Sequence, residues 1–220
     1  MMFQVPATSV AGLQASSGGI PWLPVDISGD EPTEIGELEN NLRPIIEGDS
    51  SSTTEETLTS SEISNLFDFN INNSQPITKL IPNAPIDAIV TGALRSDYQK
   101  TRIERMAQRL GVKSFCPLWH HKAKDHMRDL VNHGFEFLLS SISCEGLDEK
   151  WVGKTLDSIN LTELESLARI HRFSVDGEGG EFETTILKTP WMNKKIKING
   201  DPIWTGQRGH LLIEGVSFAE

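Results

Sequence analysis

The chain has 220 residues, of which 37% are hydrophobic and 23% are charged, and its net charge is −11 at neutral pH. This length and composition fit a globular protein with one core, or one core and a small appendage. The acidic balance argues against a protein that mainly binds nucleic acid, because that activity needs clustered Lys and Arg. No apolar run is long enough to span a membrane, and the first residues lack the pattern of a signal peptide. We therefore expect a cytoplasmic protein without a membrane or nucleic-acid partner.

The first part of the chain gives weak helix and strand signals and then becomes polar. Residues 9–16 are weakly amphipathic, residues 20–27 are a strand candidate, and residues 34–47 are a possible helix. Residues 48–64 are rich in Ser, Thr and Glu and poor in apolar side chains. This composition predicts a flexible insertion or linker.

From residue 86 the pattern becomes regular. The apolar run 86–94 predicts a buried parallel strand, and residues 95–111 predict a helix with Ser96 as its N-cap. Further strands are expected over 112–119 and 135–143, with a helix over 121–134 between them. This alternation predicts an α/β layer with a parallel sheet, in which ligands bind beyond the carboxyl ends of the strands.

The remainder of the chain predicts one more helix and a series of strands. The helix is expected over 161–173, opened by a capping box formed by Thr162 and Glu165. β-like runs follow at 184–187, 194–198 and 209–218.

The polar segment after the first regular strand is a candidate anion site. Gly92 and Ser96 stand where backbone N–H groups at a helix start could hold an anion, and Arg102 could contact a phosphate or a carboxylate. The sequence favours the alternative interpretation of the same residues, an ordinary strand-to-helix turn with a solvated helix face.

Two acidic segments lie farther along the chain. In "CEGLDEKWVGK", Trp151 either stacks on a ligand or caps the core, and Glu145 either binds a cation or lies in a polar loop. In "GEGGEFE", residues 177–183, Glu181 and Glu183 are two apart and would face the same side of an extended segment. Their charges are either solvated in a hairpin loop or shared by a cation, and the glycines favour close approach to a ligand.

Metal-binding and common catalytic motifs do not occur. The six histidines show neither HExxH nor zinc-finger spacing, so we expect no metal site formed by protein side chains. Cys116 and Cys144 follow apolar runs, which favours small buried side chains in a reducing compartment over a disulfide. GxSxG, Walker A and GxGxxG motifs are also missing.

Four stretches, taken in order, resemble the diphthine–ammonia ligase family of the N-type ATP pyrophosphatases, in the adenine nucleotide alpha hydrolase-like superfamily. They are "VTGALRSDYQKTRIERMAQRLGV", "CPLW", "CEGLDEKWVGKTLD" and "GEGGEFETTIL". The resemblance implies a Rossmann-like (HUP-type) parallel sheet with helices on both faces, and a smaller C-terminal α+β part that binds substrate. It implies a nucleotide-binding domain over 1–47 and 77–133, interrupted by an insertion over 48–76, and a substrate-binding domain over 134–220.

The resemblance also implies a reaction. The carboxylate of diphthine, a modified histidine on translation elongation factor 2, attacks the α-phosphate of ATP, and pyrophosphate leaves. Ammonia then displaces AMP to give the amide, diphthamide. ATP and Mg²⁺ would be the cofactors, the elongation factor and ammonia the partners, and a homo-oligomer is compatible with the resemblance.

One family motif is missing from this sequence. The "SGGKDS" loop that binds ATP between the first strand and first helix does not occur, so we expect the first βα unit to be missing. The chain is then either a fragment of a ligase or a relative that has lost ATP-dependent chemistry. A non-catalytic module that binds the elongation factor or a partner chain is the alternative function.

The resemblance and the motifs together predict the site residues. One group lines the nucleotide or substrate side of the cleft, and a second group binds substrate. Aromatic faces and nearby carboxylates suit the trimethylammonium group of diphthine, which cannot donate ordinary hydrogen bonds. Tyr98 and Trp119 would supply the aromatic surface. The first group is Gly92, Ser96, Tyr98, Gln99, Arg102 and Trp119, and the second is Glu145, Gly146, Trp151, Gly153, Glu178, Gly180, Glu181, Glu183 and Thr184.

Overall fold

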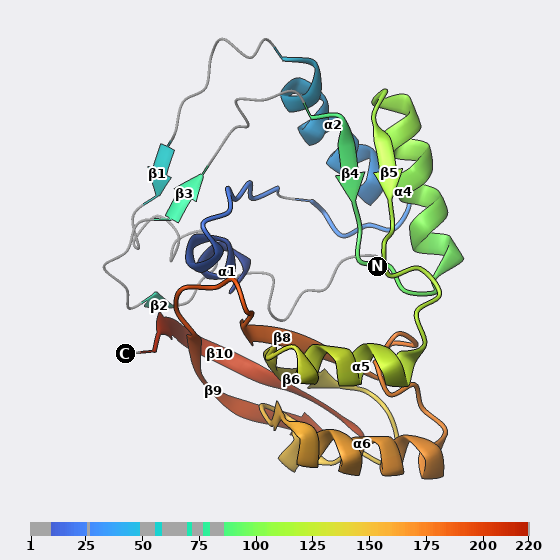
Figure 1. Ribbon diagram of the computed structural model, residues 1–220, viewed down its shortest axis with the longest axis vertical. Coiled ribbons are helices and arrows are strands. Elements are labelled where there is room, and N and C mark those ends of the chain that lie inside the picture. Colours follow the sequence, from blue (N-terminus) through green and yellow to red (C-terminus); the bar gives the residue numbers. More distant parts are fainter. Residues whose placement is uncertain are drawn as a thin grey trace. The chain divides into compact units, whose positions relative to one another are not determined.

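The computed structural model describes residues 10–25, 27–48 and 86–219, and the backbone of three short strands between them (Figure 1). These strands are β1 (Glu56–Leu58), β2 (Asn70–Ile71) and β3 (Ile77–Lys79), and β1 pairs with β3. Most of the predicted insertion therefore lies outside the described residues. The described residues fall into two compact units, which are taken separately below.

The first unit, residues 21–48 and 86–121, contains the predicted parallel strands. β4 (Ala88–Val90) and β5 (Lys113–Phe115) pair in parallel, with Ile89 beside Ser114. Helix α4 (Asp97–Arg109) connects them, and α2 (Glu34–Glu47) packs against α4. This arrangement confirms the parallel α/β prediction for these elements. Their core consists of Ile35, Ile103, Met106 and Leu110, with Ile89 and Val112 packed against it.

One face of the β4–β5 pair is open in the part of the chain that the structure describes. Val90 and Phe115 are neighbours across the two strands, and they are 67% and 52% exposed. No described helix covers them, so the predicted helices on both faces of the sheet are not seen among these residues.

The second unit, residues 10–20 and 122–219, is built on a mainly antiparallel sheet. Its central strand β6 (Glu136–Ile142) pairs with β8 (Phe182–Lys188) on one side, and with β7 (Thr155–Leu156) and β10 (Arg208–Phe218) on the other. β10 also pairs with β9 (Ile196–Thr205) and, in parallel, with β2. The prediction that residues 135–143 continue the parallel layer is therefore wrong.

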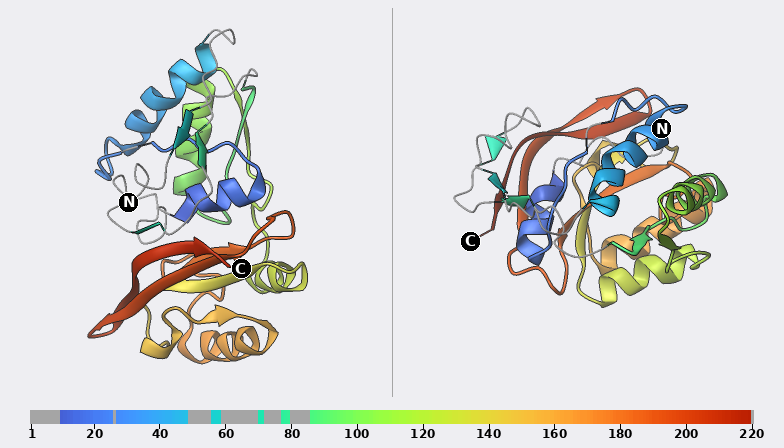
Figure 2. Two further views of the ribbon diagram at one scale, coloured as in Figure 1. Left: turned by 90° about the vertical axis from the view of Figure 1, so that its left-hand side faces the viewer. Right: turned by 90° about the horizontal axis from the view of Figure 1, so that it is seen from above.

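Helices cover both faces of this second sheet. α5 (Ala123–Asn132) and α6 (Ser158–His171) lie on one face, and α1 (Ala11–Gly18) lies on the other, where it contacts β8 (Figure 2). A short 3-10 helix, η2 (Glu149–Trp151), contacts β9. Because β6 is buried from both sides, its residues Phe137 to Ser140 form a continuous buried run. A run of this kind looks like a parallel strand in the sequence, which explains the wrong prediction.

The boundary between the two units lies earlier in the sequence than the predicted one between residues 133 and 134. The division falls between His121 and Lys122, because α5 packs against α6 and Met127 belongs to the core of the second unit. α1 also belongs to the second unit, through the hydrogen bond from Gln14 Nε2 to the Ile186 carbonyl, 2.8 Å. Across the described residues, no helix combines the length and apolar character needed to cross a bilayer.

Candidate functional site

The segments that follow β4 and β5 are held together at the carboxyl ends of these strands. The His120 N–H donates to the Leu94 carbonyl at 2.8 Å, and Arg95 Nη1 donates to the His121 carbonyl at 2.9 Å. The Cys116 thiol also donates to the carbonyl of Ala93, at 2.9 Å. The polar segments that follow these two strands are therefore neighbours.

The start of α4 is already capped by its own side chain. Ser96 Oγ accepts a hydrogen bond from the Gln99 N–H at 3.3 Å, which confirms Ser96 as the N-cap. Asp97 adds a carboxylate to the first turn, and Gly92 is exposed in the preceding loop. A capped helix start next to a carboxylate is a weak anion site, so this geometry favours the ordinary strand-to-helix turn.

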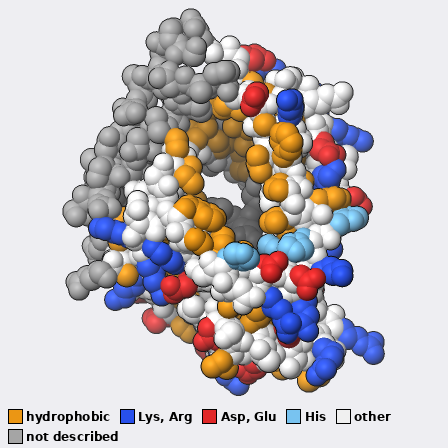
Figure 3. Space-filling model, in the orientation of Figure 1, with side chains coloured by type: hydrophobic (Ala, Val, Ile, Leu, Met, Phe, Trp, Pro, Cys, Tyr) orange, Lys and Arg blue, Asp and Glu red, His pale blue; other side chains and the backbone are white. Residues whose placement is uncertain are grey.

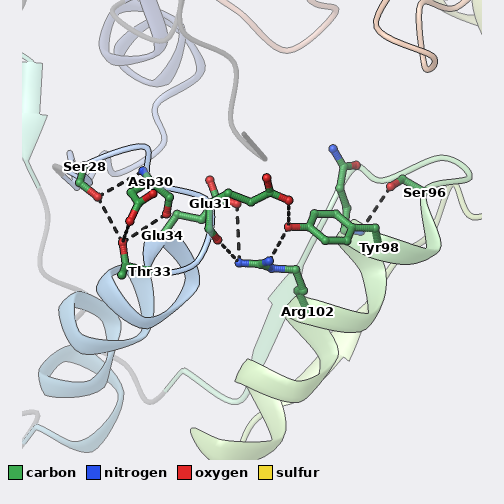
Figure 4. A network of polar contacts seen from close by, with 9 residues as sticks. Ser28, Asp30, Glu31, Thr33, Glu34, Ser96, Tyr98 and Arg102 are labelled. Atoms are coloured by element: carbon green, nitrogen blue, oxygen red, sulfur yellow. Dashed lines mark hydrogen bonds and ion pairs between the residues drawn. The ribbon is translucent and has the colours of Figure 1, made fainter.

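Arg102 and Tyr98 form a polar network with the segment before α2 (Figure 4). Tyr98 donates to Glu31 Oε1 at 2.7 Å, and Arg102 donates to the Tyr98 hydroxyl and, at 2.7 Å, to the Glu31 carbonyl. The Tyr98 hydrogen bond lowers the pKa of Glu31 and raises the pKa of Tyr98. Arg102 also lies over the Tyr98 ring and 3.8 Å from Glu34. A ligand anion would have to displace these acceptors from Arg102.

Trp119 has a cation near its ring. It stacks on His120 with ring centroids 4.8 Å apart, and Lys100 Nζ lies 5.2 Å from the Trp119 centroid. The half-buried Trp119 therefore already has a protein cation against its ring.

In the second unit, two of the three carboxylates of "GEGGEFE", those of Glu181 and Glu183, do not point into bulk water. Glu181 Oε1 accepts from the Ser174 N–H at 2.8 Å, and Glu183 is hydrogen-bonded to Ser141. The second oxygen of each carboxylate, Oε2, is buried and has no hydrogen-bond partner among the described residues. Burial raises the pKa of Glu183. The structure thus disfavours the solvated-loop interpretation of these glutamates.

Cys144 lies near Glu181 and is unreactive. Burial, with the charge of Glu181, raises the pKa of the Cys144 thiol to about 11. The thiol therefore stays protonated at neutral pH and is a poor nucleophile.

The other predicted substrate residues mostly shape the chain. Trp151 is 2% exposed in the core, with Lys154 Nζ 3.9 Å from its ring centroid, which favours the core interpretation. Gly146 has a φ of 96°, and a Cβ there would clash with the His171 ring. Glu145 is exposed. Gly153, Glu178, Gly180 and Thr184 are partly or fully exposed, in turns or, for Thr184, on β8.

Sequence reasoning missed four residues beside Glu183. Ser140 and Ser141 lie on the neighbouring strand β6, Thr185 lies two residues along β8, and His210 lies on β10, on the far side of β6. The one sequence signal was the pair of serines within the apolar run "FEFLLSSIS". These serines could not be placed beside Glu183 without knowing which strands pair.

A groove of about 510 Å³ lies between α5, α6 and the segment after α6. It is lined by Lys124, Glu165, Arg169 and Ser174, among others, and contains none of the predicted site residues. Figure 3 shows basic and acidic side chains mixed over these helices. Burial acts to raise the pKa of Glu165, but the ion pairs with Arg128 and Lys124 outweigh it and lower this pKa.

The described residues do not fit the triphosphate and Mg²⁺ of ATP. Within residues 10–25, 27–48 and 86–219, no three His, Cys, Asp or Glu side chains gather as a metal site. The start of α4 is capped, and Arg102 is occupied by Tyr98 and Glu31. We therefore assign no step on the nucleotide to these residues.

Family models match both units. The model described as the diphthamide synthase N-terminal domain matches residues 70–114, and the diphthamide synthase C-terminal domain matches residues 122–218.

Three curated relatives share the name diphthine–ammonia ligase. The chain is 34% identical to the Homo sapiens protein over 121 residues, which cover 54% of this chain and 44% of the relative. It is 36% identical to the Schizosaccharomyces pombe protein over 121 residues, 54% of this chain and 20% of the relative. It is 35% identical to the Rattus norvegicus protein over 115 residues, 52% of this chain and 43% of the relative. The matched part therefore spans less than half the length of each of these relatives. Together, the two domain matches and these relatives show that the chain belongs to the diphthine–ammonia ligase family.

Proposed function

We propose that this chain takes part in the ATP-dependent amidation of diphthine on translation elongation factor 2, with ammonia as nitrogen donor and AMP and pyrophosphate as products. Membership of the family supports this proposal, since the relatives are named for diphthine and ammonia. We assign the substrate side of the reaction to the second unit, and we place the reaction in the cytoplasm with the translation factor.

The observation that carries this assignment is the inward placement of Glu181 and Glu183. Each carboxylate has one oxygen that is buried without a described partner, although an unpaired buried carboxylate oxygen is costly. Cationic reactants, of which ammonium is one, would pair with these oxygens. Separately, we propose Tyr98 and Trp119 of the first unit as aromatic contacts for a trimethylammonium group, which would have to replace Arg102 and Lys100 at their rings.

One observation favours the alternative function, a non-catalytic module that binds the elongation factor. The described residues supply neither a phosphate cradle nor a metal cluster. On this view ATP chemistry would need residues from outside the described part of the chain or from another protein.

Pyrophosphate release separates the two functions. The chain is incubated with ATP, Mg²⁺, ammonium and the diphthine-bearing elongation factor, and unmodified factor serves as the negative control. The ligase proposal expects pyrophosphate release that depends on the modified factor and falls in Glu183→Gln but not in Glu214→Gln. Glu214 is a matched control because it is an exposed residue on β10. Binding of the purified factor without pyrophosphate release would establish the binding module and overturn the ligase.

A further inference from the structure

A β-bulge in the middle of β6 places two serines opposite one glutamate. Leu139 pairs with Thr184, and the next pair is Ser141 with Glu183, so Ser140 is the extra residue. Both Ser140 and Ser141 therefore oppose Glu183 on β8. Bulges of this kind redirect side chains, and they are frequent beside functional sites.

The polar groups around this bulge share one face of the sheet. Glu183 and Thr185 are two residues apart on β8, so their side chains point to the same side. Phe182 points to the other side, where it contacts Phe173. Leu138 pairs with Thr185, and Ser140 lies two residues beyond Leu138, on the same face.

Three of these groups are buried and unpartnered. Ser140 is 1% exposed and Thr185 is 3% exposed. Ser140 Oγ, Thr185 Oγ1 and Glu183 Oε2 have no hydrogen-bond partner within the described part of the chain. A buried polar atom without a partner is rare, and three on one face indicate an occupant that pairs with all of them.

The chemistry of the three side-chain groups indicates which kind of ligand can bind between them. One carboxylate and two hydroxyls together offer acceptors and a negative charge, which excludes an anion. Mg²⁺ is a poor fit, because it requires octahedral geometry and usually more than one carboxylate or phosphate. Ammonium is close to water in size, carries one positive charge and has only donors to offer. Helix α1, which lies on this face, brings no charged side chain of its own.

We propose that Ser140, Glu183 and Thr185 form the ammonium site of this protein. This inference rests on the proposed function, in which ammonia is the nitrogen donor. Glu183 contributes the countercharge, and the two hydroxyls accept hydrogen bonds from the ammonium N–H groups.

The site also prepares the nucleophile. Ammonium has no free electron pair, so one N–H bond must break, its electron pair remaining on nitrogen while the proton forms an O–H bond on Glu183. Burial raises the pKa of Glu183, which makes its carboxylate a better proton acceptor.

A row of side chains across three strands leads the proton outward. Ser141 lies between Glu183 on β8 and His210 on β10, since it pairs with both. His210 is exposed, so it can exchange protons with water. The other charged groups at this end of the sheet are Glu181 and Arg208, which precede Glu183 and His210 by two residues.

Ammonium binding to the 220-residue chain tests the site without ATP or the elongation factor. Thermal unfolding is followed in increasing ammonium chloride, with sodium chloride keeping the ionic strength constant. We expect a saturable rise in Tm with ammonium. The affinity should fall by roughly tenfold or more in Glu183→Gln and Thr185→Val, because each loses a bond to a charged group.

A matched variant controls for burial. Thr189 is also buried with an unpartnered hydroxyl, but it lies beyond the end of β8, so Thr189→Val should bind ammonium like the parent chain. If Thr185→Val does not fold, as judged by circular dichroism, Ser140→Ala takes its place. Equal stabilisation by potassium chloride, no ammonium effect, or an equal loss in Thr189→Val would each overturn the site.

The failures of the site and of the function are distinguishable. Ammonium binding with no pyrophosphate release leaves the site standing and removes the ligase function. Factor-dependent pyrophosphate release with an unchanged KM for ammonium in Thr185→Val leaves the ligase standing and overturns the site.

Discussion

The carboxyl group of Glu183 is half-buried, with one oxygen hydrogen-bonded and the other without a partner among the described residues. Burial raises its pKa above the ordinary value, because ionising this carboxyl group costs more in the folded protein than in the unfolded chain. A carboxyl group with a raised pKa does not affect the free energy of unfolding at low pH, where it is protonated in both the folded and the unfolded chain. It destabilises the fold as the pH rises through the ordinary glutamate range, where the unfolded chain ionises more readily.

Glu183→Gln should therefore be more stable than the parent chain near pH 7. The difference should shrink to zero by about pH 3.5, where both folded and unfolded carboxyl groups are protonated. Urea unfolding of the two proteins at several pH values measures it. A parent chain that is the more stable of the two at neutral pH would show that Glu183 is fully paired in solution.

Gly146 is a position where the backbone requires glycine. Its φ is 96°, and a side chain would clash with the His171 ring. We expect Gly146→Ala to lower the free energy of unfolding by about 1–3 kcal/mol. Adding His171→Ala should recover the steric part of this loss. Gly92→Ala is the control, because a Cβ there has no neighbour within 4 Å.

At the residue scale, the sequence offered only local spacing. Glu181 and Glu183 stood out because two carboxylates two positions apart share a side of an extended chain. Ser140, Thr185 and His210 could not be found this way, since their significance arises from pairing between β6, β8 and β10. Trp151 was ambiguous because a ring beside glycines fits both a core and a ligand wall.

At the scale of elements, α2 and α4 are joined by a charged cluster at Glu39. Arg109 Nε donates to Glu39 Oε2 at 2.7 Å, and Arg43 Nη2 donates to Oε1 at 2.6 Å. The Arg109 hydrogen bond is the largest of the causes that lower the pKa of Glu39. The hydrogen bonds to the Glu39 carboxylate therefore stabilise the fold at pH values above the ordinary glutamate pKa. This stabilisation is lost as the pH falls through the lowered pKa that Glu39 has in the folded protein.

Glu39→Gln should destabilise the first unit by about 1 kcal/mol near neutral pH. The effect should disappear in acid, because the parent carboxylate is then protonated as well. Glu47→Gln, which removes the exposed partner of Arg43, should change stability by a smaller amount. Hydrogen exchange of α2 and α4 amides measures both, and equal effects from the two variants would contradict the account.

Helices marked by a cap residue and by apolar spacing were predicted well from the sequence. Strands whose place depends on which other strand they pair with were not. The helix after Ser96 follows from its cap and its apolar spacing. Helix α6 begins at Ser158, before the predicted start, because Asp157 accepts from the N–H groups of Ile159 and Asn160. The supposed capping-box residue Thr162 lies within the helix and bonds back to the Ser158 carbonyl.

At the scale of the whole molecule, α1 joins the second unit through contacts about 170 residues away. Ser17 Oγ donates to the Lys194 carbonyl at 2.6 Å and accepts from the Lys194 N–H at 2.9 Å. Nothing near residue 17 in the sequence indicates this partner. The assignment of residues 1–47 to one domain with 77–133 could not anticipate it.

Ser17→Ala should lower the stability of the second unit by about 1–3 kcal/mol, because two backbone groups lose a buried partner. The first unit should be unaffected. Ser16→Ala is the control, since Ser16 accepts the Gly19 N–H through its backbone carbonyl, which the substitution keeps. Hydrogen exchange measured separately for the amides of each unit tests this prediction. Faster exchange in both units of Ser17→Ala would contradict it.

Transfer of ¹⁵N from ammonium to the elongation factor tests the proposed function most directly. The chain, ATP, Mg²⁺, ¹⁵N-ammonium and diphthine-bearing factor are incubated, and the modified histidine is analysed by mass spectrometry. The account predicts one ¹⁵N amide at that residue, with the yield reduced in Glu183→Gln. Factor that binds to the chain but gains no ¹⁵N would contradict it.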